Sequence, residues 1–104
     1  APGVRTIIPH CGRLNGGYEA LRGSGVWERP NIYTDTSPSR TPPEMIADYI
    51  RRYGHGRILF GSDFPFGTPR SALDNVLRLR LPADVEEDVL GRNLRRLLAG
   101  VAPG

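Results

Sequence analysis

Apolar residues gather in three short segments of the chain: VRTIIPH at 4–10, NIYTDT at 31–36 and RILFGSD at 57–63. Each segment contains β-branched or aromatic residues, and Gly, Pro or Asn residues bound it. This pattern is typical of short buried strands. The chain therefore predicts three β-strands.

Between the second and third predicted strands the apolar residues change to a helical period. In TPPEMIADYIRRYG (41–54) five apolar residues share one helical face: Met45, Ile46, Tyr49, Ile50 and Tyr53. Thr41 and Glu44 have the spacing of a capping box, and Gly54 follows the last apolar residue. We predict a helix over 42–53.

Two further helices are predicted towards the C-terminus, one from Thr68 that ends before Pro82 and one that begins at Pro82. We expect them to bury Leu73, Val76 and Leu77 in the first helix, and Val85, Val89 and Leu90 in the second. Gly91 is expected to end the second helix, and Asn93 to cap a closing helical turn. A short helix is also expected around 18–21.

The alternation of strands and helices indicates crossover connections, which join parallel strands. We therefore predict an α/β fold, with residues 1–104 forming one domain. The first residues contain neither Met nor the pattern of a signal peptide, so we also expect a truncated N-terminus.

Composition and charge argue against several classes of protein. The fourteen basic residues are spread along the chain and the net charge is +3, a pattern of solvated helix faces rather than of a nucleic-acid-binding patch. No apolar run approaches the roughly 18 residues of a membrane span. The single cysteine, Cys11, excludes an internal disulfide and agrees with a reducing compartment. We expect a cytoplasmic protein without nucleic-acid or membrane partners.

Polar side chains end all three predicted strands: His10 the first, Asp35 with Thr36 the second, and Asp63 the third. The carboxyl ends of parallel strands meet at one edge of a sheet, where catalytic groups collect. Carboxylate oxygens suit a divalent cation, and imidazole can bind a metal or move a proton near neutral pH. We interpret His10 and Asp63 as site residues and Asp35 as a turn-forming residue.

Several other residues have two interpretations. Cys11 follows His10, but neighbours on a strand point to opposite faces, so we expect a buried thiol rather than a nucleophile. Four aromatic residues could stack on an aromatic substrate or anchor the core and loops: Trp27, Tyr33, Phe64 and Phe66.

Four segments together resemble a known family: IIPHCGR (7–13), NIYTDTS (31–37), RILFGSDFPF (57–66) and ADVEEDVLGRNLRRLL (83–98). They are similar to the C-terminal part of the metal-dependent amidohydrolase superfamily. The more specific resemblance is to the amidohydrolase-related branch that contains aminocarboxymuconate-semialdehyde decarboxylase and the resorcylate decarboxylases.

The resemblance implies a fold and an activity. The fold would be the C-terminal three βα units of a (β/α)8 TIM barrel, with parallel strands and helices on the outer face. The parent enzyme would be a metal-dependent hydrolase or non-oxidative decarboxylase that acts on a small carboxylate-bearing or cyclic substrate. Its cofactor would be a divalent metal, zinc or alternatively manganese.

The resemblance also implies residue roles. Asp63 matches the aspartate of the last strand, which binds the metal, and His10 matches a histidine that contacts substrate and helps to transfer a proton. The only other histidine, His55, is expected in a turn at the opposite side of the sheet.

The family's H-x-H motif and its fifth-strand histidine have no counterpart in this chain. We therefore expect the chain to be inactive alone and to need the missing N-terminal half of the barrel or self-association. The alternative is a non-catalytic α/β module that binds a partner through an open sheet edge.

Overall fold

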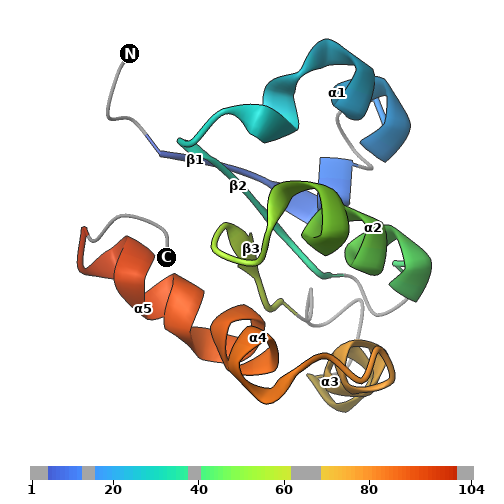
Figure 1. Cartoon of the computed structure of the whole chain (residues 1–104), viewed down its shortest axis with the longest axis vertical. Helices are drawn as coiled ribbons and strands as arrows, with labels where there is room; N and C mark the ends of the chain where they lie inside the picture. Colours follow the sequence, from blue (N-terminus) through green and yellow to red (C-terminus); the bar gives the residue numbers. More distant parts are fainter. Residues whose placement is uncertain (1–4, 13–15, 38–40, 62–68, 101–104) are drawn as a thin grey trace.

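The computed structural model describes residues 5–12, 16–37, 41–61 and 69–100. Within these residues the chain forms a parallel sheet of three strands in the order β1-β2-β3 (Figure 1). The strands are β1 (Thr6–Ile8), β2 (Ile32–Asp35) and β3 (Ile58–Leu59). The predicted parallel α/β arrangement is confirmed at this level.

Helices follow each strand, and those after the first two strands carry the chain back to the next one (Figure 1). The α-helices are α1 (Tyr18–Ser24), α2 (Pro43–Tyr53), α3 (Pro69–Leu77), α4 (Ala83–Glu87) and α5 (Asn93–Leu98). Two short 3₁₀ segments, η1 (Pro9–Gly12) and η2 (Val26–Glu28), and one π-helical segment, η3 (Asp88–Arg92), complete the described elements. None of the helices in the described parts of the chain has the length and apolar character to cross a membrane.

The strands are shorter than predicted. β1 ends at Ile8 rather than at position 10, because His10 and Cys11 adopt left-handed backbone angles that cannot continue a strand. β2 ends at Asp35, close to the prediction. The predicted end of the third strand, Asp63, lies outside the described residues.

The helices pack against one face of the sheet. Strand register aligns Ile8, Thr34 and Ile58, and Ile58 belongs to a buried apolar cluster that α2 enters with Ile46 and Tyr49. Other members of the cluster come from the remaining helical segments: Tyr18, Trp27, Val76 and Val89. Each large apolar side chain buried here contributes about 1.5–3 kcal/mol. The core therefore lies between this face and the helices.

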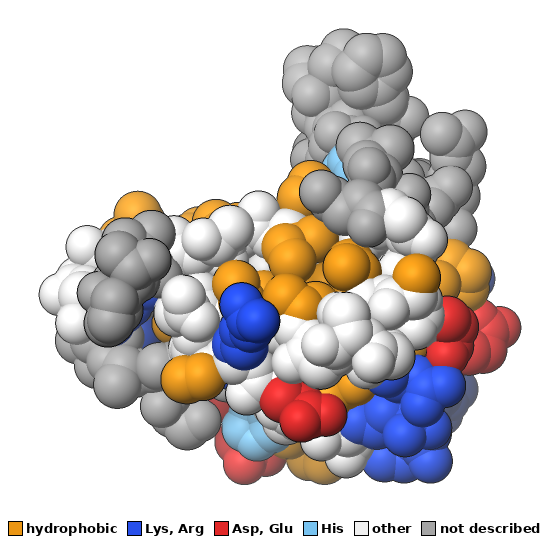
Figure 2. All heavy atoms as spheres, turned by 90° about the horizontal axis from the view of Figure 1, so that it is seen from above, with side chains coloured by type: hydrophobic (Ala, Val, Ile, Leu, Met, Phe, Trp, Pro, Cys, Tyr) orange, Lys and Arg blue, Asp and Glu red, His pale blue; other side chains and the backbone are white. Residues whose placement is uncertain are grey.

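The opposite face is less open than three isolated strands suggest. Register and alternation place Ile7, Tyr33, Asp35 and Leu59 on it. Ile7 on β1 is 45% exposed, whereas Tyr33 and Leu59 are buried. Figure 2 shows hydrophobic side chains gathered in the middle of one face of the molecule, with a basic side chain beside them and further acidic and basic side chains in the lower part of the view.

The start of α2 corrects the predicted capping box. The helix begins at Pro43, and the residue before it makes no side-chain capping bond. The Thr41 hydroxyl instead donates a hydrogen bond to the Ser37 carbonyl, 3.0 Å away. At the other end Gly54 has φ 83° and donates its N–H to the Ile50 carbonyl, so the predicted helix stop is confirmed.

Three predictions for the later helices are wrong. Gly91 does not end a helix, because 83–98 is one helical run in which the π-helical segment η3 joins α4 to α5. Asn93 accordingly lies inside the run and caps nothing. In α3 the buried residues are Ala72, Asn75 and Val76, and Leu77 is exposed. The face of α3 that packs against the core is therefore formed by these three residues and not by Leu77.

Candidate functional site

The chain reverses direction sharply where β1 ends. His10, Cys11 and Gly12 have φ values of 57°, 52° and 85°, so three consecutive residues lie in the left-handed region. Only the glycine adopts this region without strain, and each of the other two costs on the order of 1 kcal/mol or more. A Cβ atom at position 12 would also collide with the Leu21 side chain. The turn therefore requires Gly12.

Hydrogen bonds to β2 hold this turn in place. The Cys11 N–H donates to the Thr34 Oγ1 atom at 3.1 Å, and the Thr34 hydroxyl donates to the Ile8 carbonyl at 2.6 Å. The His10 N–H donates to the Asp35 Oδ1 atom at 3.2 Å. Each bond of this kind contributes on the order of 1 kcal/mol, which offsets the strained backbone.

The imidazole of His10 lies at the carboxyl ends of β1 and β2. Its Nδ1 atom is 2.9 Å from the Ser37 carbonyl oxygen, 3.0 Å from the Ser37 Oγ atom and 3.7 Å from the Asp35 Oδ1 atom. The ring is 14% exposed. His10 thus lies at the predicted edge of the sheet, although in a turn rather than on a strand.

Asp35 does more than form a turn. Its Oδ1 atom accepts the Ser37 N–H at 3.0 Å, which is the predicted turn, and also the Ser37 hydroxyl at 2.6 Å and the His10 N–H. Sequence reasoning missed the link from Asp35 and Ser37 to His10. The available signal was the D-x-S spacing directly after the strand that neighbours His10.

Cys11 is a buried thiol, as predicted. Its side chain is inaccessible, and burial, helped by the Asp35 charge, raises the pKa of the thiol to about 12. The thiol donates weakly to the Asp35 carbonyl at 3.4 Å. The predicted reason, that neighbours on a strand point to opposite faces, was wrong, since neither His10 nor Cys11 lies in a strand. Cys11 is packed and protonated at neutral pH, so it does not act as a nucleophile.

His55 lies away from this edge, as predicted, and has a structural partner. It precedes β3, and its Nδ1 atom is 2.7 Å from the Asp88 Oδ2 atom. Asp88 also pairs with Arg92 at 2.8 Å and with Arg96 at 3.3 Å. This cluster ties η3 and α5 to the turn before β3 and contains no group of the candidate site.

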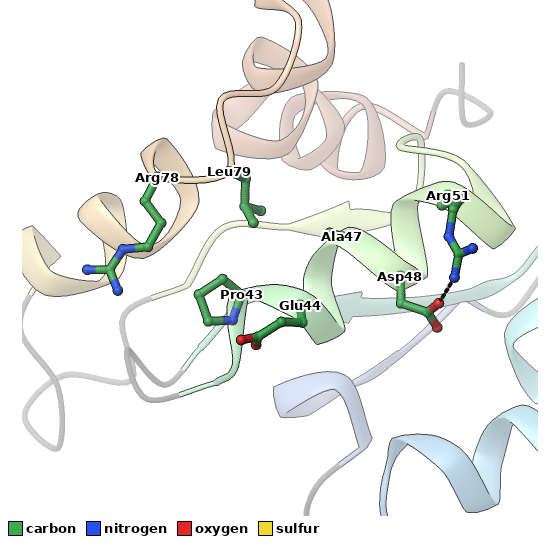
Figure 3. Close-up of a pocket in the computed structure, with 7 residues that line it drawn as sticks. All are labelled: Pro43, Glu44, Ala47, Asp48, Arg51, Arg78 and Leu79. Carbon is green, nitrogen blue, oxygen red and sulfur yellow. Dashed lines mark hydrogen bonds and ion pairs between the residues drawn. The ribbon is translucent and has the colours of Figure 1, made fainter.

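A surface groove of about 700 Å³ lies elsewhere, between α2 and the segment after α3 (Figure 3). Its lining residues are Pro43, Glu44, Ala47, Asp48, Arg51, Arg78 and Leu79. Figure 3 shows Leu79 pointing towards α2 and Asp48 paired with Arg51. The groove contains neither His10 nor Asp35, so we place the candidate site at the His10 turn, where the convergent polar groups lie.

A family model described as amidohydrolase matches residues 1–99. The chain belongs to the amidohydrolase family. Amidohydrolases generally use divalent metals and include hydrolases, which agrees with the resemblance that the strand-end motifs indicated. No curated protein and no solved structure shows a significant match to the chain.

The described part of this amidohydrolase does not form a metal centre by itself. Within it, no group of three or more His, Cys, Asp or Glu residues is arranged to hold a metal ion. A catalytic zinc site needs about three protein ligands. His10 and Asp35 supply one imidazole and one carboxylate, and the Asp35 Oδ1 atom already accepts three hydrogen bonds. The predicted ligand, Asp63, lies outside the described residues.

Proposed function

We propose that this amidohydrolase chain forms the last three βα units of a (β/α)8 barrel in a metal-dependent enzyme. The observation that carries the proposal is the position of His10, held by Asp35 and Ser37 where the carboxyl ends of two parallel strands meet. This edge is where barrel enzymes collect their catalytic groups. The other βα units would come from residues beyond these 104.

The reaction we propose is hydrolysis or non-oxidative decarboxylation of a small carboxylate-bearing or cyclic substrate. His10 would bind the substrate and move a proton at its Nε2 atom, because Nδ1 faces Ser37. Asp63 would be a metal ligand in the complete barrel, with zinc as the expected metal and manganese as the alternative. When bound, such a metal would activate water or polarise a carboxylate or carbonyl group.

The test uses the full-length product of the gene that encodes this chain, loaded with zinc or manganese. We would assay it for CO₂ release from aromatic and other cyclic carboxylic acids, and for hydrolysis of cyclic esters and amides. We expect His10→Asn to lower kcat by about 10²-fold or more. Asp63→Asn should lower the bound metal, measured by elemental analysis.

The matched control is Asp74→Asn, which removes an exposed carboxylate on α3 that pairs with Arg70. It should leave the rate and the metal content unchanged. Full activity in the His10→Asn variant would contradict the proposed role of His10. Unchanged metal content in the Asp63→Asn variant would contradict the proposed ligand.

One observation favours a second candidate, the non-catalytic α/β module. In the described structure β1 and β3 each pair only with β2, so neither outer edge has a neighbouring strand there, and Ile7 on β1 is also 45% exposed. A module of this kind would bind no stoichiometric metal, and the Asp63→Asn change would not affect it. Metal content therefore separates the two candidates.

A further inference from the structure

We propose that Asp35 and Ser37 are positioning residues that set the tautomer and orientation of the His10 imidazole. The proposal deepens the proposed function and rests on it for the catalytic use of His10. The geometric part concerns only which ring nitrogen carries the proton. That part can be measured without a substrate or a metal.

One carboxylate oxygen organises the whole arrangement. The Asp35 Oδ1 atom accepts three hydrogen bonds, from the His10 N–H at 3.2 Å, the Ser37 N–H at 3.0 Å and the Ser37 hydroxyl at 2.6 Å. It therefore joins the backbone of the His10 turn to the segment that follows β2. Hydrogen bonds to an ionised acceptor are roughly twice as strong as neutral ones.

The Ser37 contacts decide where the imidazole carries its proton. The Ser37 carbonyl, 2.9 Å from the His10 Nδ1 atom, can only accept a hydrogen bond. The Ser37 hydroxyl donates its own proton to Asp35, so towards Nδ1 it accepts as well. Two acceptors face Nδ1, and Nδ1 is therefore protonated. In the neutral ring the basic lone pair is then at Nε2.

The last residue described after β3 leaves room for this network. A Cβ atom at Gly61 would lie 3.2 Å from the Ser37 Oγ atom, 3.3 Å from the Ser37 Cβ atom and 3.6 Å from the Asp35 Cγ atom. The Gly61 N–H also donates to the Thr36 Oγ1 atom at 3.3 Å. Gly61 therefore allows Ser37 to keep its place between Asp35 and His10, which gives the FGSD motif a physical reason for its glycine.

The strained turn explains why positioning is needed. Left-handed backbone angles at His10 and Cys11 persist only where surrounding contacts determine them. The Asp35 carboxylate supplies the contact for His10. Without it, the turn would relax and Ser37 would lose two of its anchoring bonds.

The experiment is a long-range ¹H–¹⁵N correlation NMR spectrum of the full chain at a pH where both imidazoles are neutral. The chain contains two histidines, so His55, which faces Asp88, serves as an internal reference. We expect wild-type His10 to carry its proton on Nδ1. Asp35→Ala should shift His10 towards the Nε2-protonated form. Ser37→Ala removes the hydroxyl but keeps the backbone carbonyl at Nδ1, so it should shift His10 less, and Asp35→Asn, which keeps an acceptor oxygen, should retain the Nδ1 form.

A wild-type His10 that is protonated on Nε2 would overturn the proposal, and no variant needs to fold for that result. If Asp35→Ala unfolds, Ser37→Ala decides the question: because it keeps the backbone carbonyl at Nδ1, a His10 ring that is fully protonated on Nε2 in that variant would also overturn the proposal. A change at His10 with His55 unchanged supports it. Failure of the proposed function would be seen separately, as full activity of His10→Asn in the complete enzyme.

Discussion

Asp48 on α2 illustrates how neighbours set the properties of a single residue. The Tyr18 hydroxyl donates to its Oδ2 atom at 2.7 Å, and the guanidinium groups of Arg51 and Arg52 lie beside it. The Tyr18 hydrogen bond and, after it, the two arginines lower the pKa of Asp48 to about 2. Burial and, after it, the same hydrogen bond raise the pKa of Tyr18 above its ordinary value.

This shift makes stability depend on pH. Because the pKa of Asp48 is lower in the folded chain, its ionised form stabilises the fold fully above its ordinary value of 3.8, and this contribution is lost as the pH falls through about 2. Asp48→Asn should cost about 1 kcal/mol at neutral pH, since the group is partly exposed, and the cost should vanish at pH about 2. Urea unfolding followed across this pH range measures it.

Tyr18→Phe is the matched variant, because it keeps the buried ring and removes the hydroxyl that contributes most to the lowered pKa of Asp48. Tyr18→Phe should therefore remove most of the pH dependence of the unfolding free energy that Asp48 causes. A wild-type pH profile in Tyr18→Phe would show that the hydroxyl is not the cause.

At the scale of elements, the closing helical run is joined to the sheet by Asn93. This residue is buried, and its Nδ2 atom donates to the carbonyls of His55 and Ile58, the latter at 2.9 Å. Arg96 donates back to the Asn93 Oδ1 atom at 3.2 Å. The G-x-N-x-x-R motif thus includes residues that attach the final helix to the start of β3.

Asn93→Ala should therefore destabilise the fold by about 2 kcal/mol, because two buried carbonyls lose their donor and nothing replaces it. The free energy of unfolding in urea measures the effect. Leu94→Ala, at the exposed neighbouring position, should cost less than about 0.5 kcal/mol. Equal losses for the two variants would argue against the bridging role.

The elements that depend on local periodicity were predictable. Helix α2, its Gly54 stop and the three strands follow from the spacing of apolar residues. The sequence did not reveal the role of Asn93 as a bridge, because its partners are 35 and 38 residues away along the chain. The capping box failed for a similar reason, since the Thr41 hydroxyl is used by the Ser37 carbonyl.

The candidate site was predictable only in part. The order of strands was enough to bring His10 to the edge where β2 ends, because parallel strands align their carboxyl ends. The link through Asp35 and Ser37 depends on left-handed angles at His10 and Cys11, and such angles are not expected of those residue types from sequence. Asp63 remains a prediction.

At the scale of the whole molecule, the outer edges of the described sheet, at β3 and at β1, have no neighbouring strand among the described residues. Ile7 is 45% exposed there, on the face opposite the helices. Exposed strand edges with apolar side chains favour pairing with another chain. We therefore expect the three-stranded sheet to pair with further strands or with a second copy of the chain.

We expect the isolated chain to self-associate in sedimentation-velocity experiments. Ile7→Lys should weaken the association by about tenfold or more, because it removes apolar area and places a charge at the edge. Leu77→Lys, on the outer helix α3, is the matched control and should leave the association unchanged. A wild-type chain that sediments as a monomer and unfolds cooperatively would contradict this prediction.

Among the described residues, the contacts that hold the His10 turn and ring arise between residues 8 and 37, within the first two strands and the segments that follow them. Any protein segment that docks on the β1 edge would meet an imidazole that is already oriented. The conformational entropy of the His10 side chain would already have been lost on folding. Docking would not have to order this side chain again, so the affinity of the docked segment would be higher.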